Sequence, residues 1–321
     1  PGILIRNVFL PCIMLVTGMF VAEYRSEKLT DFILWWAVVA SGWPFVAIIL
    51  GIPTSDVSHL ELQWLTGGEW ARGFVNPITK QFERATYLTL SALPAVAAAF
   101  IFPCFRGFLR RAIAVCVVVA AVVVSAVTET RSGVAAFATG IGVYVCLRRG
   151  TFLRLLFLLA LGGGALIYLQ GTLDAFLPER FNVAYTQERG LTGRIDIWYA
   201  RIHAVPISVF GIGMSLLLQE GISSHNQFLD ILFSFGILGF IFYITLLVSI
   251  GMIGFRWLLR SGRSSLSVGV MTALIMFGAL SLIDSIMFSA RQLNHFIWFL
   301  FGVVFVCSVC EERNRRTGGA S

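Results

Sequence analysis

Charged residues are scarce in this chain of 321 residues: they make up 13% of it, whereas hydrophobic residues make up 57%. Soluble domains carry about 25% charged residues. Because so little charge cannot cover the surface of a soluble protein of this length, the composition predicts a protein that crosses a membrane several times. The mean hydropathy of +0.84 agrees with this prediction.

The sequence also lacks the short motifs of several enzyme classes. It contains no HExxH, HxxxH or carboxylate-rich pattern for a metal, and no GxSxG, Walker loop or dinucleotide-binding glycine motif. No two aspartates form a DxD pair, so a metal-dependent nucleotide-sugar site is not supported. We therefore expect neither a metal nor another cofactor.

The positions of the arginines and cysteines argue against two further classes of protein, those that bind nucleic acid and those stabilised by disulfides. The formal net charge is +7, but the arginines are scattered between apolar runs and form no continuous basic face, so we expect no nucleic-acid partner. All six cysteines lie in or at the edges of apolar runs, which argues against a disulfide framework.

Long apolar runs are what the chain does have. A spanning helix needs about 20 mostly apolar residues, and nine runs approach that length. We expect an all-α polytopic transmembrane bundle that forms a single integral membrane domain over 1–321. The spans expected are 7–22, 31–50, 86–104, 112–128, 132–147, 152–170, 226–251, 266–287 and 294–310.

The loop arginines predict the orientation of the bundle. With nine spans, four basic groups fall on one side, which should be the cytoplasm. The loops 51–85 and 171–225 then lie outside the cytoplasm, and so does Pro1. An odd number of missing spans would return the native N-terminus to the cytoplasm, so we expect an N-terminal truncation from about twelve spans. The basic groups are Arg106/Arg110/Arg111, Arg148/Arg149/Arg154, Arg256/Arg260/Arg263 and Arg313/Arg315/Arg316.

A polar cluster, Ser223–Gln227, stands at the start of the seventh span. Ser224 fits an N-cap, and Gln227 follows three residues later, as in a capping box. His225 would then be the first helical residue. Free backbone N–H groups gather there and favour an anion and a neutral imidazole, which could act as a general base. The alternative is a histidine that only caps the helix.

The outward loop 171–225 predicts an amphipathic helix from about Gly193. Arg194, Trp198 and Arg201 recur at helical spacing. An arginine over the mouth of the bundle could bind a diphosphate through two parallel hydrogen bonds. The alternative is an interfacial helix whose arginines face solvent or lipid phosphates.

Other polar residues gather at the outward ends of the spans, where charge near a membrane is costly and usually functional. Arg131 lies between the fourth and fifth spans, Asp284 near the end of the eighth, and Arg291 before the ninth. Asn226 and Asp230 are four residues apart and share a helix face, whereas His225 points elsewhere. For Arg131, snorkelling toward water is the alternative to a functional role.

Several of these residues together resemble the O-antigen ligase family, a branch of the O-antigen ligase and polymerase superfamily of bacterial surface-glycan assembly. His225-Asn226, nine residues, Gly236, two residues and Gly239 match its H-[NSQ]-x9-G-x-x-[GTY] pattern. Gly193-Arg194 with Trp198 is similar to its G-R-x-x-x-W stretch, and Arg131-Ser132-Gly133 is similar to its outward arginine turn. The resemblance covers roughly 70–310.

The resemblance implies a metal-independent, inverting glycosyltransferase of the GT-C-like type in the bacterial inner membrane, with its site facing the periplasm. The donor would be a glycan on undecaprenyl diphosphate. Arg131 and Arg194 would hold the diphosphate, and His225 would deprotonate or orient the acceptor hydroxyl. The remaining residues expected to bind substrate are Asn226, Trp198, Arg201, Arg291 and Asp284.

The acceptor separates the possible functions. A ligase would pass the glycan to the lipid A core or another acceptor, and a polymerase would pass it to a second lipid-linked unit. A transporter of lipid-linked glycans would favour internal repeats and polar residues at the bilayer midplane, whereas here polarity gathers at one face. A structural membrane protein would not need a histidine and arginines at one mouth.

Overall fold

The computed structural model describes part of the chain, and all structural statements concern that part. The described residues are 9–24, 28–50, 52–53, 73–75, 82–127, 131–148, 190–205, 207–213, 224, 226–282 and 291–318. The span predicted over 152–170 lies outside the described residues.

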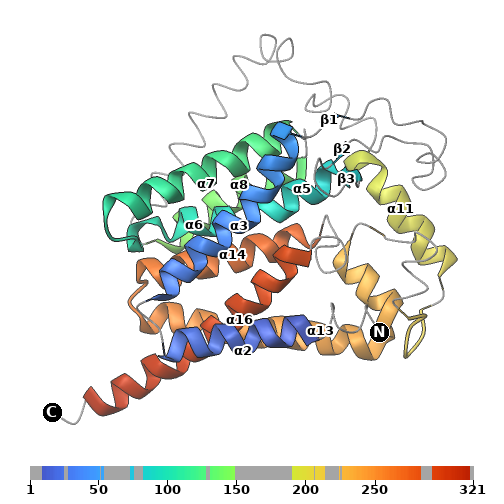
Figure 1. Ribbon diagram of the computed structural model, residues 1–321. Coiled ribbons are helices and arrows are strands. Elements are labelled where there is room, and N and C mark those ends of the chain that lie inside the picture. Colours follow the sequence, from blue (N-terminus) through green and yellow to red (C-terminus); the bar gives the residue numbers. More distant parts are fainter. Residues whose placement is uncertain are drawn as a thin grey trace, which may run out of the picture.

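The described chain is a helical bundle, which confirms the predicted all-α membrane fold (Figure 1). Helices occupy the other eight predicted spans, and an additional helix, α11 (Gly190–Ala204), lies in the loop 171–225. Four described helices are long and apolar enough to cross a membrane: Leu29–Val46, Phe108–Ser125, Gln227–Arg260 and Leu293–Arg313. The helices at the predicted spans are α2 (Leu10–Tyr24), α3 (Leu29–Leu50), α5 (Ala85–Ala92), α6 (Pro94–Phe100), α7 (Phe108–Val127), α8 (Arg131–Leu147), α13 (Gln227–Arg260), α14 (Ser265–Leu280) and α16 (Arg291–Gly318).

Two local features differ from the sequence prediction. The span expected over 86–104 is broken between α5 and α6, because Pro94 lacks the N–H that would continue the helix and instead occupies the first turn of α6. A small antiparallel sheet, which was not predicted, pairs β1 (Ile52–Pro53), β2 (Gly73–Val75) and β3 (Phe82–Arg84) in that order. The sheet lies at the same end of the molecule as α11 (Figure 1).

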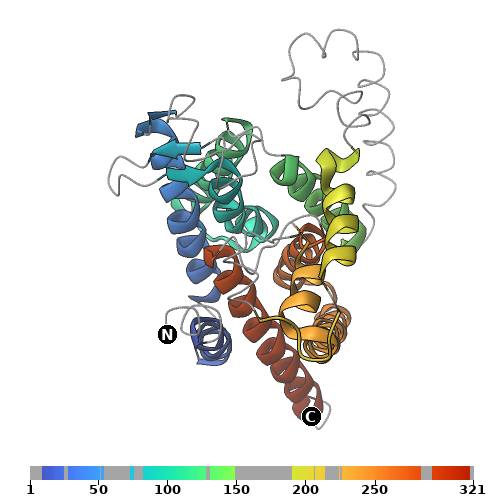
Figure 2. The same ribbon diagram turned by 90° about the vertical axis from the view of Figure 1, so that its right-hand side faces the viewer.

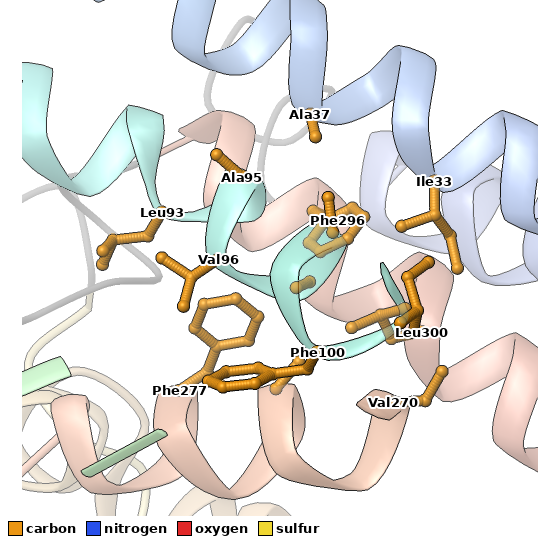
Figure 3. Packing of buried hydrophobic residues seen from close by; sticks show 14 of the residues in the cluster. Ile33, Ala37, Leu93, Ala95, Val96, Phe100, Val270, Phe277, Phe296 and Leu300 are labelled. Atoms are coloured by element: carbon orange, nitrogen blue, oxygen red, sulfur yellow. The ribbon is translucent and has the colours of Figure 1, made fainter. Parts of the chain in front are cut away.

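Aliphatic and aromatic side chains fill the centre of the bundle where α3, α6, α14 and α16 meet (Figure 3). Phe277 of α14 and Phe296 of α16 are almost fully buried and pack edge to face, with ring centroids 6.3 Å apart. A Cβ at Gly18 of α2 would lie 2.1 Å from the Phe299 oxygen of α16. Such close backbone contact provides the packing that holds helices together in a membrane.

The arginine-rich ends of several helices meet at one end of the bundle. Arg260, at the end of α13, pairs with Glu312 of α16 at 2.9 Å. Arg263 donates to the carbonyl oxygen of Leu147, at the end of α8, at 3.4 Å. Figure 1 shows the C-terminal end of α16 on the opposite side of the molecule from α11 and the sheet. The bundle is therefore polarised, with this arginine-rich end far from the segment that precedes α13.

Candidate active site

The start of α13 is capped by Asn226. Its Oδ1 accepts hydrogen bonds from the backbone N–H groups of Phe228 (3.0 Å) and Leu229 (3.2 Å). The predicted N-cap at Ser224 is therefore wrong, and so is the prediction that the helix begins at residue 225. The capping box is also wrong, because Gln227 is the first helical residue and its side chain donates to the Tyr243 hydroxyl.

Ser224 is held by Asp230 from the first turn of α13. The Ser224 N–H and hydroxyl both donate to Oδ1 of Asp230, at 2.8 and 2.7 Å. Both residues are fully buried. The Ser224 hydroxyl also accepts from the Asn226 N–H at 3.2 Å. A buried carboxylate is stabilised by such donors, so Asp230 fixes the chain immediately before the helix.

Trp198 of α11 holds the same segment from the other side. Its indole N–H donates to the Ser224 carbonyl oxygen at 2.8 Å, and its side chain is half-buried. Figure 2 shows α11 beside the first half of α13. Trp198, the tryptophan of the predicted G-R-x-x-x-W stretch, therefore links α11 to the residue that precedes His225.

The C-terminal end of α14 completes this arrangement. The Asn226 Nδ2 donates to the Leu282 oxygen at 3.0 Å, and the Gln227 N–H donates to the Ser281 oxygen at 3.0 Å. Free carbonyl groups at the end of α14 thus accept from one side-chain amide and one backbone N–H at the start of α13. His225 itself lies outside the described residues, but its two chain neighbours are fixed by α11, α13 and α14.

A second anchoring point lies about two and a half turns further along α13, where the helix bends at Gly236. The φ and ψ angles of Gly236 are 69° and −168°, a combination open essentially to glycine alone. The break frees backbone groups, and the loop 207–213 pairs with four of them. Ile212 and Gly213 donate to carbonyls before the bend, and Ile237 and Leu238 donate to loop carbonyls, at 2.9–3.3 Å.

These contacts explain the two glycines of the sequence pattern. A Cβ at Gly236 would lie 2.3 Å from the Val209 oxygen and 2.5 Å from the Ser208 oxygen, both backbone atoms. A Cβ at Gly239 would lie 2.2 Å from the Cβ of Phe235. Gly236 leaves space for the backbone of the loop 207–213, and Gly239 leaves space for the Phe235 side chain next to the bend.

Comparison with known families agrees with this geometry. Residues 116–244 match the model of the family described as O-antigen ligase. The chain contains an O-antigen ligase domain. The match runs from α7 through α11 to the first half of α13, so it includes the bend and all the contacts that hold Ser224. No curated protein matches the chain in a direct search.

An O-antigen ligase domain indicates a glycosyltransferase-type enzyme of the ligase or polymerase kind. The family implies lipid-linked glycan substrates. Together with the apolar helices, the family match indicates a multi-pass bacterial membrane protein. In the described part of the chain, no group of three or more side chains could hold a metal ion.

The site residues predicted from the sequence are only partly described. Arg131 is the first residue of α8, and Arg194 lies one helical turn before Trp198 on α11. Arg291 is the first residue of α16. The side chains of these three arginines lie outside the described part, as do His225 and Asp284. Arg201 is half-buried on α11.

The role of Asp230 was not predicted from the sequence. The sequence predicted only that Asp230 shares a helix face with Asn226. It did not indicate that the Asp230 carboxylate bonds to Ser224, which lies before the helix. A usable signal was a lone carboxylate one turn inside an apolar span, since burying it requires hydrogen-bond donors nearby. Asn226 and Trp198, predicted to bind substrate, make the described contacts within the protein, and their substrate contacts remain predictions.

Trp198→Phe is expected to lower the rate of transfer with little change in the amount of folded protein. The substitution keeps an aromatic ring but leaves the buried Ser224 carbonyl without its donor, which costs about 1–3 kcal/mol of stability. The segment next to His225 is then held less firmly, and we expect the rate to fall roughly tenfold, equivalent to about 1.4 kcal/mol of activation free energy. Steady-state kinetics should show the loss in kcat. Trp35→Phe is the control, because Trp35 is 59% exposed on α3; equal losses in both variants would contradict a positioning role.

Proposed function

We propose that this O-antigen ligase domain transfers a glycan from undecaprenyl diphosphate to an acceptor hydroxyl at the periplasmic face of the bacterial inner membrane. The observation that carries the proposal is the fixation of both chain neighbours of His225, by Trp198, Asp230 and the end of α14. Rigid neighbours suit a residue that must meet a reacting atom within a narrow geometry.

In the proposed reaction, His225 accepts the proton of the acceptor hydroxyl. The acceptor oxygen bonds to the anomeric carbon from the face opposite the diphosphate, and the bond between that carbon and the diphosphate oxygen breaks. The diphosphate leaves as an anion, which Arg131 and Arg194 would stabilise. This displacement inverts the anomeric configuration and needs no metal. Arg201, Arg291 and Asp284 would contact the glycan or the acceptor.

The proposed topology places the loops 51–85 and 171–225 outside the cytoplasm. The support for it is that α11 and the sheet lie at one end of the bundle, whereas Arg260 and Arg263 lie at the other. Arginine-rich ends face the cytoplasm in most membrane proteins. The donor's lipid tail would remain in the bilayer around the apolar helices.

Purified protein in nanodiscs, supplied with an undecaprenyl-diphosphate-linked glycan, tests the proposal. Lipid A core and a second lipid-linked unit are offered as acceptors in separate reactions. Product on the lipid A core identifies a ligase, and lengthened lipid-linked glycan identifies a polymerase. We expect the rate to survive a metal chelator. No product with either acceptor, from protein that elutes as a single folded species, would contradict the proposal.

A further inference from the structure

A cavity of about 200 Å³ lies between α13, α14 and α16, on the side of α13 that carries Tyr243. An engineered cavity of about 150 Å³ binds benzene, so this one has room for about eight carbon atoms. Most of its lining is apolar, and none of the lining residues is charged. The apolar lining comprises Leu247, Ile250, Met271, Leu274, Ile275, Phe277, Ile297, Trp298 and Phe301.

The polar lining residues are concentrated toward one end of the cavity. Gln227 begins α13, Ser281 follows α14, and Asn294 lies in the first turn of α16. Gln227 bonds to the Tyr243 hydroxyl. Asn294 is 4% exposed, and within the described residues its side-chain amide has no hydrogen bond. A buried amide without a partner is unfavourable, so the cavity contains a donor and an acceptor available to a ligand.

Two helical glycines keep the cavity open. Gly251 of α13 and Gly278 of α14 line it, and a Cβ on either would meet no atom within 4 Å. Glycine is less favourable than alanine inside a helix, and close packing does not require it at these two positions. An empty apolar space also forfeits contacts that a filled one would make. Both observations favour a space that a ligand occupies.

The cavity reaches the outer surface of the bundle along α14. Ile275 lines it and is 41% exposed. In a bilayer, an apolar surface of this kind faces lipid chains. A hydrocarbon could therefore enter sideways from the membrane without crossing a polar region.

We propose that this cavity binds a hydrocarbon chain of a lipid, with the Asn294 amide hydrogen-bonded to an oxygen at the start of that chain. The chain is either the isoprenoid tail of the glycan donor or an acyl chain. Because Gln227 is two residues from His225, an isoprenoid seated here would bring its diphosphate toward the proposed reaction site. The assignment of the cavity to the donor's isoprenoid tail rests on the proposed function, whereas the assignment of the cavity to a lipid chain in general does not.

Photoreactive ten-carbon alcohols, one isoprenoid and one saturated, test the proposal on the purified full chain in nanodiscs. We expect both to label residues of α13, α14 and α16 that line the cavity. Gly278→Leu and Gly251→Leu fill the space and should each lower this labelling by about tenfold, equivalent to about 1.4 kcal/mol of binding. Gly142→Leu is the control, because a Cβ there also meets nothing within 4 Å and Gly142 does not line the cavity.

Asn294→Ala provides a second test that leaves the cavity volume nearly intact. It should weaken labelling by the alcohols and leave labelling by a matched hydrocarbon probe without the hydroxyl unchanged. Stronger labelling by the isoprenoid identifies the donor's tail, and stronger labelling by the saturated chain identifies an acyl chain. Labelling outside the cavity, or unchanged labelling in both filled variants, would overturn the proposal. Cavity labelling of a protein that transfers no glycan would refute only the proposed function.

Discussion

His225→Ala is expected to lower glycan transfer by about 10²- to 10⁴-fold, which is the usual contribution of a positioned general base. Alanine cannot accept the acceptor's proton, while the contacts of Ser224 and Asn226 use other groups and should survive. The loss should therefore appear in the rate constant of the chemical step, with donor affinity nearly unchanged. The measurement is single-turnover transfer by purified protein with saturating donor.

His203→Ala is the matched control for this variant. His203 lies on the same domain, on the last turn of α11, where its exposed ring packs on Tyr199 with centroids 4.3 Å apart. Its loss should leave transfer near the wild-type rate. Added imidazole should partly restore the His225→Ala variant, because a free base can enter the vacated space. Wild-type transfer by His225→Ala would assign the histidine a role other than that of the base.

Gly236→Ala is expected to abolish transfer by separating the loop 207–213 from α13. The added Cβ would lie 2.3 Å from the Val209 oxygen, and the backbone angles at 236 are open essentially to glycine alone. Strain of this kind costs about 1–3 kcal/mol, before the loss of the four backbone hydrogen bonds across the bend is included. The thermal midpoint and the transfer rate should both fall.

Gly211→Ala should produce the same defect from the loop side, because its Cβ would lie 2.5 Å from the Ser234 carbonyl oxygen. Gly142→Ala is the control: it lies within α8, and its Cβ would meet no atom within 4 Å. That variant should be unchanged or more stable by about 0.4–1 kcal/mol. If Gly236→Ala behaved like Gly142→Ala, the bend would not be required for activity.

The sequence predicted those features that depend on local pattern. Apolar run length predicted the helices, since a run of this length can satisfy its backbone in a membrane only as a helix. Amphipathic spacing predicted the helix that the structure shows as α11. The glycine pattern identified position 236 without indicating that it bends the helix.

The remaining features depend on contacts between distant segments. Ser224 and Asn226 are both residue types that favour an N-cap. Which of them caps α13 depends on distant partners: Ser224 is held by Trp198, 26 residues away, and Asn226 by Leu282, 56 residues away. The carboxylate that fixes Ser224 could not be assigned from its own helix face. The cavity is built by three helices that are separate in the sequence, so no local pattern could have indicated it.

We expect Arg131 and Arg194 to bind the same diphosphate of the donor. A double-mutant cycle measures it directly, using the affinity of farnesyl diphosphate for the purified wild-type chain, Arg131→Ala, Arg194→Ala and the double variant. We expect each single variant to bind more weakly and the two losses not to be additive, with a coupling of about 0.5–3 kcal/mol. Additive losses, or wild-type affinity in either single variant, would contradict it.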